Sequence, residues 1–396
     1  MKYDFNKVVP RRGTGCVKWD EPTPLPSEGS GEAVIPLWVA DMDFQAAPAI
    51  IQALQQRVSH GVFGYTLVPD SYYKAVISWF HRRHQWDISR SWIQYTSGVV
   101  PALSVIVKAF TQPGDEVILQ TPVYNCFFSS VRNNGCKIVE SRLILGDDHR
   151  YTMDFDDLEQ KVRSPRAKLL ILCNPHNPAG RVWTSEELAR VYNICIENNV
   201  IVVCDEIHNE LTYCGQRYVA YGTVDKGLTN AIICTSPSKS FNTAGLQIAN
   251  IICSNPEWRE KIDRAINDNE VCDVNPFGVV ALQAAYNESE EWLDALCDYL
   301  WQNYQTVCDF FARELPSLKI TPLEGTYLVW VDIRKTGLSS DEITEKLLSE
   351  AKVWVNSGTM YGQEAGEGFI RLNIACPRSL LAEGLERVAG VMKKLL

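Results

Sequence analysis

The sequence predicts an α/β protein built on a mainly parallel β-sheet, and three apolar runs carry this prediction. Residues 168–173, 200–204 and 231–235 have the length of single strands, consist mostly of aliphatic side chains, and run directly into polar residues. Such runs are typical of strands buried on both faces. Helical segments alternate with these strands, which favours parallel pairing. Because open α/β sheets bind ligands at the carboxyl ends of their strands, the polar residues there are functional candidates.

The chain begins with an arm that we place at residues 1–45. Its first 35 residues are rich in proline, glycine and charge and lack strong periodicity. Gly13 and Gly15 match the start of a dinucleotide-binding fingerprint, but Lys18 stands in place of the third glycine and no strand precedes it. We therefore exclude a nicotinamide site. A helix is expected over residues 48–57, with an apolar face made of Ile50, Ile51, Leu54 and Val58.

The next two segments hold candidates for phosphate binding. Residues 61–66 contain Tyr65, which either serves a ligand or simply anchors a loop, and a helix is expected over residues 71–84. A short strand, a Ser-Gly turn and an apolar helix follow between residues 93 and 103. Backbone N–H groups at the start of a helix can hold a phosphate, and the helix dipole favours its charge. The best placed residues there are Gly98, Val99 and Val100.

Two further strands are expected at residues 116–119 and 137–140, and Tyr124 lies just beyond the first. Tyr124 either fills the core or faces a ligand at the strand end. The sequence Thr-Ser-Glu-Glu at residues 184–187 has the form of a capping box, which predicts the start of the helix that leads to Val200. Strand and helix thus alternate through this half of the chain.

Two strand ends carry complementary polar groups. Asn174 is the first polar side chain after the strand at residues 168–173 and could donate to an oxygen on a ligand ring. Asp205 follows the apolar run at residues 200–204. A carboxylate facing a pyridine nitrogen keeps that nitrogen protonated and makes the ring an electron sink. Asp205 could therefore keep the nitrogen of a bound pyridine ring protonated.

A third strand end carries Lys239, in a loop that follows the strand at residues 231–235. Ser236 and Ser238 flank Pro237 and could offer hydroxyl donors to an anion. A lysine kept neutral by its surroundings can condense with a carbonyl. The two properties together describe a site for pyridoxal phosphate, whereas a solvated lysine in a surface loop is the structural alternative.

The remaining chain predicts a second domain. A strand at residues 246–253 and long helices from Trp258 to Leu315 are expected, with a domain boundary near residue 285. We therefore predict a large domain of residues 46–285 and a smaller α/β domain of residues 286–396, which the arm joins. Its expected strands span residues 327–332, 353–355 and 369–374, and its expected helix spans residues 340–349.

Arg371 lies inside one of these apolar strands. A buried arginine needs a carboxylate or a water-filled cleft. That carboxylate could belong to a ligand or to an internal salt bridge.

Composition limits the class of protein. The chain has 396 residues, 46% of them hydrophobic, and a formal net charge of −10, which argues against a nucleic-acid partner. It shows no apolar signal core at its amino terminus and no run of bilayer length, so we expect a cytoplasmic protein without a membrane partner. Its 13 cysteines lack C-x-x-C spacing and mostly lie in apolar segments, which favours structural thiols over disulfides or metal ligands.

Three motifs at the strand ends together resemble a known family. Residues 174–180 (Asn-Pro-His-Asn-Pro-Ala-Gly), 205–208 (Asp-Glu-Ile-His) and 236–239 (Ser-Pro-Ser-Lys) occur in the order found in fold-type I pyridoxal-phosphate enzymes. The chain is most similar to the carbon–sulfur β-lyases of the MalY/PatB group, through residues 35–44, 64–66 and 238–246 and through His208. The resemblance implies pyridoxal 5′-phosphate as cofactor and the fold-type I transferase fold, with a mainly parallel seven-stranded sheet in its large domain.

The same resemblance implies roles for single residues. Tyr124 matches the residue that stacks on the cofactor ring, and Tyr65 matches a tyrosine that reaches the partner subunit's phosphate in a homodimer with shared sites. Arg371 and Asn174 match the substrate side of the site, where the arginine binds the α-carboxylate. Ala40 stands where a glycine is usual in related enzymes and where a backbone N–H reaches the substrate carboxylate.

The implied reaction belongs to cysteine and methionine metabolism. Lys239 would hold the cofactor and then remove the α-proton, while Asp205 holds the ring as an electron sink. Cystathionine, cystine or another S-substituted cysteine would yield pyruvate, ammonia and a thiol. An aminotransferase is the main alternative, and a MalY-like regulator that binds a transcription factor is the alternative from another class. His208 in place of a tyrosine, and Gln247 in place of a phosphate-binding arginine, favour the lyase.

Overall fold

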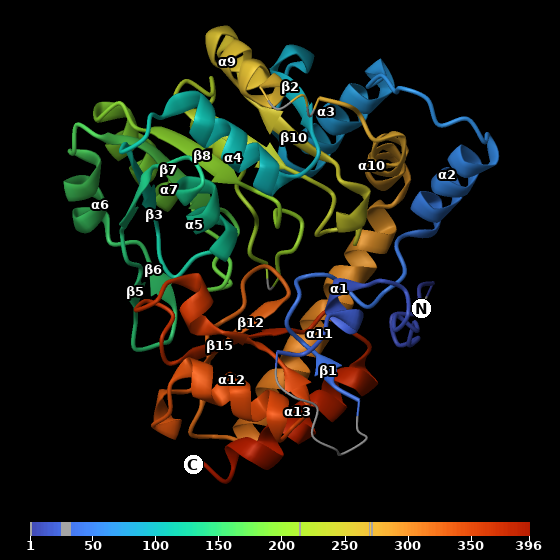
Figure 1. Ribbon diagram of the computed structural model, residues 1–396, viewed down its shortest axis with the longest axis vertical. Coiled ribbons are helices and arrows are strands. Elements are labelled where there is room, and N and C mark those ends of the chain that lie inside the picture. Colours follow the sequence, from blue (N-terminus) through green and yellow to red (C-terminus); the bar gives the residue numbers. More distant parts are fainter. Residues whose placement is uncertain (1, 25–32, 214, 269, 271) are drawn as a thin grey trace.

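The computed structural model describes residues 2–24, 33–213, 215–268, 270 and 272–396. Figure 1 shows two stacked parts, an upper one formed by the blue-to-yellow segments and a lower one in orange and red. The dark blue start of the chain lies against the lower part, and α11 (Glu290–Glu314) begins at the junction and runs downward. In the portion of the chain described, no helix has the length and apolar character needed to cross a bilayer.

The upper part is organised by a mainly parallel sheet, which confirms the predicted fold class. Within the described residues, this sheet has seven strands, and only β10 is antiparallel to its neighbours. In spatial order the strands are β2 (Ile93–Thr96), β10 (Ala249–Ile252), β9 (Ala231–Thr235), β8 (Ile201–Asp205), β7 (Ala167–Cys173), β3 (Glu116–Leu119) and β4 (Lys137–Glu140).

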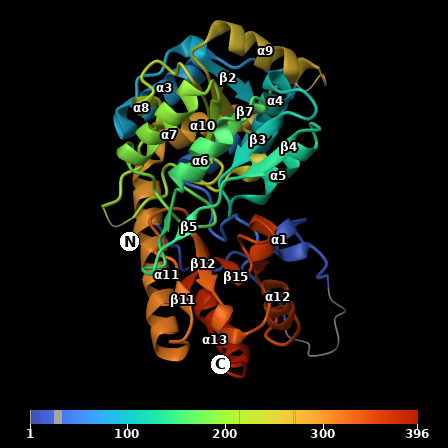
Figure 2. The ribbon, with the colours of Figure 1, turned by 90° about the vertical axis from the view of Figure 1, so that its left-hand side faces the viewer.

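Both faces of this sheet are covered, as its continuous apolar strands require. In β7, Leu169 and Ile171 pack into the core beneath α4 and α5, whereas Leu170 and Leu172 pack into the core on the other face. Figure 2 shows α6 and α7 on one side of the sheet and α4 and α5 on the other. The sequence signals that start these helices are present in the structure: the Thr184 hydroxyl and the Glu187 carboxylate form the predicted capping box of α7.

The helices predicted over residues 48–57, 71–84 and 340–349 are present with closely matching bounds, and the structure also contains helices that were not predicted, at residues 17–20, 125–132, 155–162, 221–224 and 378–392. In chain order the helices are α1 (Val17–Asp20), α2 (Pro48–Ser59), α3 (Asp70–His84), α4 (Val99–Phe110), α5 (Asn125–Arg132), α6 (Phe155–Val162), α7 (Ser185–Glu197), α8 (Tyr221–Val224), α9 (Pro256–Asn267), α10 (Pro276–Glu288), α11, α12 (Ser340–Ser349) and α13 (Arg378–Met392).

The strand expected over residues 246–253 is shorter than predicted. Gln247 has a φ of 52°, in the left-handed region, and follows a 3₁₀ turn at Ala244–Leu246, so the backbone becomes extended only at β10.

The lower part contains an antiparallel sheet. In the described chain it has four strands, in the order β11 (Lys319–Ile320), β12 (Leu328–Asp332), β15 (Phe369–Asn373) and β14 (Asn356–Ser357). The arm reaches this part through β1 (Ile35–Pro36), which pairs in parallel with β13 (Val353–Trp354). A hairpin of β5 (Ile144–Leu145) and β6 (Tyr151–Thr152) completes the strands. The division of the chain into three domains stays a prediction, and its boundary near residue 285 falls in the last turn of α10.

Candidate active site

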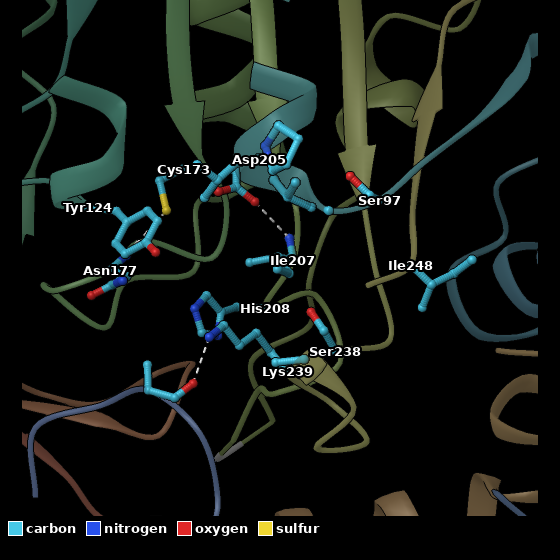
Figure 3. A pocket seen from close by; sticks show the side chains of 16 residues that line it. Ser97, Tyr124, Cys173, Asn177, Asp205, Ile207, His208, Ser238, Lys239 and Ile248 are labelled. Atoms are coloured by element: carbon cyan, nitrogen blue, oxygen red, sulfur yellow. Dashed lines mark hydrogen bonds between the residues drawn. The ribbon is translucent and has the colours of Figure 1, made fainter. Parts of the chain in front are cut away.

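A cavity of about 200 Å³ lies where β7, β8 and β9 end, which is the position expected of a ligand site in an open α/β sheet. Figure 3 shows its wall, to which segments far apart in the sequence contribute. The lining residues are Ala40, Ser97, Gly98, Val99, Val100, Pro101, Tyr124, Cys173, Asn177, Asp205, Ile207, His208, Ser238, Lys239, Ala244 and Ile248.

Lys239 lies in the loop after β9, with its amine inside the cavity (Figure 3). Its Nζ donates to the carbonyl oxygen of Ala40 at 2.6 Å. Burial, followed by the positive charge of Arg371, lowers the pKa of Lys239 to about 8, although Asp41 and Asp205 act in the opposite direction. The amine can therefore lose its proton near neutral pH, which a nucleophile or proton acceptor requires.

Asp205 is the last residue of β8 and is buried at the cavity wall. Its Oδ1 accepts a hydrogen bond from the Ile207 backbone N–H at 3.1 Å. Burial raises the pKa of Asp205 to about 7, even though that N–H and the Lys239 amine favour its charged form. A cationic partner in the cavity would restore the carboxylate, since an opposite charge nearby lowers the pKa of an acid.

The predicted role of Asn174 is not favoured by its placement. Its Nδ2 donates to the Glu206 carboxylate at 3.2 Å and to the Val219 carbonyl at 3.0 Å, and Asn174 is not part of the cavity wall. The asparagine that does line the cavity is Asn177, whose Oδ1 accepts from Arg371 at 3.2 Å. Asn177 precedes the second proline of the same motif, and this repeated Asn-Pro pair is the signal that could have identified it.

The start of α4 faces the cavity, as predicted for Gly98, Val99 and Val100. No side chain among the described residues caps this helix, and Pro101 has no N–H to offer. The free amides therefore suit an anion, and the helix dipole adds to this preference. Ser97, which lines the same end of the cavity, was not singled out from the sequence.

The two serines of the lysine loop differ in their availability. Ser238 lines the cavity. The Ser236 hydroxyl donates instead to the Ile248 carbonyl at 2.6 Å and accepts from the Ser238 backbone N–H at 3.1 Å. The Ser236 hydroxyl proton is already used in the bond to Ile248, so its placement does not favour the expected role of donating a hydrogen bond to an anion.

Arg371 is buried in β15, and its surroundings argue against an internal salt bridge. Its guanidinium donates to Asn177 and to the Trp38 carbonyl, at 3.2 and 2.9 Å. It also lies over the Tyr361 ring, 4.8 Å from the centroid. Within the described residues, no carboxylate pairs with Arg371 and its Nε has no hydrogen-bond partner. A buried charge without a carboxylate is suited to binding one from a ligand.

His208 and Tyr124 both line the wall (Figure 3). Burial, with Lys239 and Arg371 nearby, lowers the pKa of His208 well below its usual value, so the ring is neutral. Its Nδ1 has no hydrogen-bond partner among the described residues. Tyr124 is half-buried, and desolvation, followed by the neighbouring Cys126, raises its pKa well above the ordinary range. Its hydroxyl therefore stays protonated at neutral pH.

Tyr65 and Gln247 lie outside the cavity of the single chain, and the lining residues also do not include Asn174, Ser236 or Arg371. Tyr65 is 98% exposed and belongs to the loop between α2 and α3. Gln247 is exposed at the end of the 3₁₀ turn before β10, and its backbone carbonyl accepts from the Tyr95 hydroxyl. Neither touches the site within one subunit.

The residues present fit pyridoxal phosphate. The cavity offers an amine of lowered pKa for an aldehyde, a carboxylate for a ring nitrogen, a neutral histidine with a free ring nitrogen, and an uncapped helix start for a phosphate. Among the residues described, no group of three or more histidine, cysteine or acidic side chains is arranged to hold a metal ion.

Comparison with known proteins supports the same assignment. The model of the aminotransferase class I and II family matches residues 32–388. The chain is 40% identical over 390 residues to cystathionine beta-lyase PatB of Bacillus subtilis, covering 98% of this chain and all of that protein.

Two solved structures with bound pyridoxal phosphate also match. A putative aminotransferase from Clostridium difficile has a TM-score of 0.94 at 38% identity, covering 98% of this chain and 100% of that one. A C–S lyase from Staphylococcus hominis has a TM-score of 0.89 at 33% identity, covering 98% and 99%. From these matches and the geometry of the cavity, the chain belongs to the aminotransferase class I and II family of pyridoxal-phosphate enzymes.

Proposed function

We propose that this protein is a pyridoxal-phosphate-dependent carbon–sulfur β-lyase. Its substrates would be cystathionine, cystine or related S-substituted L-cysteines, and water would complete their conversion to pyruvate, ammonia and a thiol. The observation that carries the choice is the relationship, along nearly the whole chain, with proteins named cystathionine β-lyases and C–S lyases. The cavity supplies the groups that such a reaction needs, on a cofactor that the related structures contain.

The cofactor would be held at three points. Gly98, Val99 and Val100 present backbone amides to a phosphate, with Ser97 and Ser238 beside them. Asp205 would hold the proton of the ring nitrogen, and Lys239 would join the aldehyde carbon. Tyr124 offers an aromatic face for the ring. Pyridoxal phosphate, once bound, supplies a protonated ring that withdraws electrons from the α-carbon of an amino acid.

The protein's own groups then orient the substrate and move one proton. Arg371 would bind the α-carboxylate, since its Nε is free and the Asn177 and Trp38 contacts fix its plane. The amino group of the substrate would displace the Lys239 amine from the aldehyde carbon, and the freed amine would then accept the proton from the α-carbon. As that proton leaves, the bond between the β-carbon and sulfur breaks and the sulfur departs as a thiolate.

An aminotransferase is the second candidate, because one of the matching structures carries that name. The two reactions differ in their need for a keto acid. Purified protein given L-cystathionine without any keto acid should release pyruvate and thiol over many turnovers, followed with a coupled dehydrogenase and a disulfide dye. Turnover that stops after one event per active site, and resumes when a keto acid is added, would establish the aminotransferase instead.

We also infer that the active unit is a cytoplasmic homodimer. The loop between α2 and α3 exposes apolar side chains, which in one chain have nothing to cover them: Val62, Phe63, Tyr65 and Leu67. We expect a second copy of the chain to cover these side chains, because Tyr65 resembles a residue that reaches the partner's phosphate.

The cysteines described are free thiols, which suits a reducing compartment such as the cytoplasm. The proposed domains are residues 1–45, 46–285 and 286–396, and the pairing of β1 with β13 supports placing the arm with the last of these.

A further inference from the structure

An ionic cluster in the arm adjoins Ala40, the residue whose carbonyl binds the active-site lysine. Arg11 pairs with Asp41 at 2.6 Å and with Asp43 at 2.7 Å. Lys18, whose side chain is completely buried, pairs with Asp43 at 2.7 Å and lies 3.6 Å from Asp41. The Trp19 ring N–H donates to Asp43 at 2.8 Å. Two cations and two anions thus meet in a small volume, and their formal charges cancel.

The same acidic segment carries the carbonyl that holds Lys239. Ala40 immediately precedes Asp41, and its oxygen accepts from Lys239 Nζ at 2.6 Å and from the Tyr327 hydroxyl at 2.9 Å. Asn373 donates to the Asp41 carbonyl at 2.6 Å on one side of this segment. Asn242, from the lysine loop, accepts from the Met42 N–H at 3.0 Å on the other. The segment is therefore fixed at both ends, with one carbonyl facing the amine.

The cluster also reaches the amine through its charge. After burial and Arg371, both of which lower the pKa of Lys239, the largest opposing influence is Asp41, ahead of Asp205. Asp41 is in turn neutralised by Arg11 and Lys18. Six titratable or charged residues from five segments face Lys239: Asp41, Cys126, Asp205, His208, Tyr327 and Arg371.

We propose that the N-terminal arm controls the protonation of Lys239: the Arg11–Asp41 ion pair fixes the Ala40 carbonyl against the amine and sets the charge that the amine experiences. Arg11 and Asp41 are then positioning residues, which act through Lys239 without touching the substrate. The inference rests on the proposed function only in that Lys239 must react with pyridoxal phosphate. This role would explain why the cluster is present. Its contribution to the free energy of unfolding is expected to be small, because desolvation offsets the attraction of buried charges.

Removing a positive charge from the cluster and removing a negative charge should shift the pKa of Lys239 in opposite directions. Arg11→Gln leaves one excess negative charge beside Lys239 and should favour the protonated amine. Asp41→Asn leaves one excess positive charge and should favour the neutral amine. The double variant restores neutrality. Each single change should move the pKa of Lys239 by about half a unit, the size expected of one charge at short range across partly exposed groups.

The test measures how fast the full-length protein, stripped of cofactor, captures added pyridoxal phosphate, followed by absorbance at a series of pH values. Only the neutral amine attacks the aldehyde, so the rate rises with pH around the pKa of Lys239. The midpoint should move up by about 0.5 pH unit for Arg11→Gln and down by about 0.5 for Asp41→Asn. It should return to the original value in the double variant and stay there in Arg11→Lys, which keeps the charge.

Controls separate this effect from general loosening of the fold. Arg90 and Asp70 form an exposed pair of the same chemistry, and Arg90→Gln should not move the midpoint. Circular dichroism establishes that each variant is folded, and the charge-conserving variant covers the case in which a neutral substitution fails to fold. Midpoints that are equal in all variants, or that move in the same direction for both single changes, overturn the inference. Failure of the unaltered protein to capture pyridoxal phosphate would overturn the proposed function and the inference together.

Discussion

Replacing Arg371 should weaken the binding of the substrate without weakening the binding of the cofactor. Arg371 is 3% exposed, donates to one amide and one carbonyl, and has no carboxylate partner within the described chain. In Arg371→Gln, the α-carboxylate of the substrate would enter a buried site without a cation. The cofactor groups at Gly98, Asp205 and Lys239 would keep their own partners, so retention of pyridoxal phosphate should not change.

The size of the effect follows from the cost of leaving a buried charge unpaired. Removing one partner of such a pair costs about 3–5 kcal/mol. Because each 1.4 kcal/mol is a factor of ten, kcat/KM should fall by about two to four orders of magnitude. The carboxylate is bound in both the ground state and the transition state, so most of the loss should appear in KM. The free protein should not be destabilised by more than about 1 kcal/mol, since the substitution removes a buried charge that lacks a carboxylate.

The assay compares steady-state kinetics on L-cystathionine with inhibition by L-alanine, which carries the same carboxylate but no leaving group. The inhibition constant for L-alanine should rise in Arg371→Gln by a factor similar to that of KM. Arg334→Gln is a matched control, since Arg334 pairs with Asp332 at the edge of the same sheet and is 55% exposed. A loss of less than tenfold in kcat/KM, or an equal loss of affinity for the cofactor, would refute the assignment of Arg371 as the carboxylate site.

Three further predictions concern the cofactor and the subunits. The protein should be yellow, borohydride should fix the cofactor to Lys239 alone as judged by peptide mapping, and Lys239→Ala should abolish turnover. Asp205 has a pKa of about 7 against 3.8 in an unfolded chain, so in cofactor-free protein its contribution to stability is present below pH 4 and is lost as the pH rises to 7. That loss should reach up to about 4 kcal/mol, and Asp205→Asn should remove it, so that the difference in thermal midpoint between the two proteins changes between pH 4.5 and 7.5. Tyr65→Phe should weaken cofactor retention, and mixing an inactive Tyr65 variant with Lys239→Ala should restore partial activity. No recovery despite demonstrated subunit exchange would count against a shared site.

The parts of the site that sequence reasoning placed well are those attached to buried strands. Asp205 and Lys239 lie where apolar runs stop, and a parallel sheet brings such ends to one edge. Gly98 was placed for a similar reason, because a Ser-Gly turn between a strand and an apolar helix defines a helix start. For these residues, the local sequence pattern and the folded structure agree on where the residue lies.

The predicted site residues whose placement does not favour their expected roles lie in turns, where the direction of a side chain depends on the path of the backbone. Asn174 comes first after β7, yet its amide turns back to Glu206, and Asn177 faces the cavity instead. The Ser236 hydroxyl binds the Ile248 carbonyl, a contact between segments that no local pattern reveals. The start of the arm shows no strong periodicity, and the partners of Asp41 and Asp43 became visible only when the folded chain brought residues 11–19 beside them.

The burial of the cavity explains why its acid and its base have unusual pKa values together. Burial disfavours every charge, so it lowers the pKa of Lys239 to about 8 and raises that of Asp205 to about 7. Both values lie near neutral pH, where a proton can be moved at small cost. The charges that adjust these values come from elsewhere, Arg371 from β15 and Asp41 from the arm. The ends of strands in the seven-stranded sheet thus supply the reacting groups, while the arm and β15 set their charge. We expect loss of either contribution to alter the pH dependence before it alters the fold.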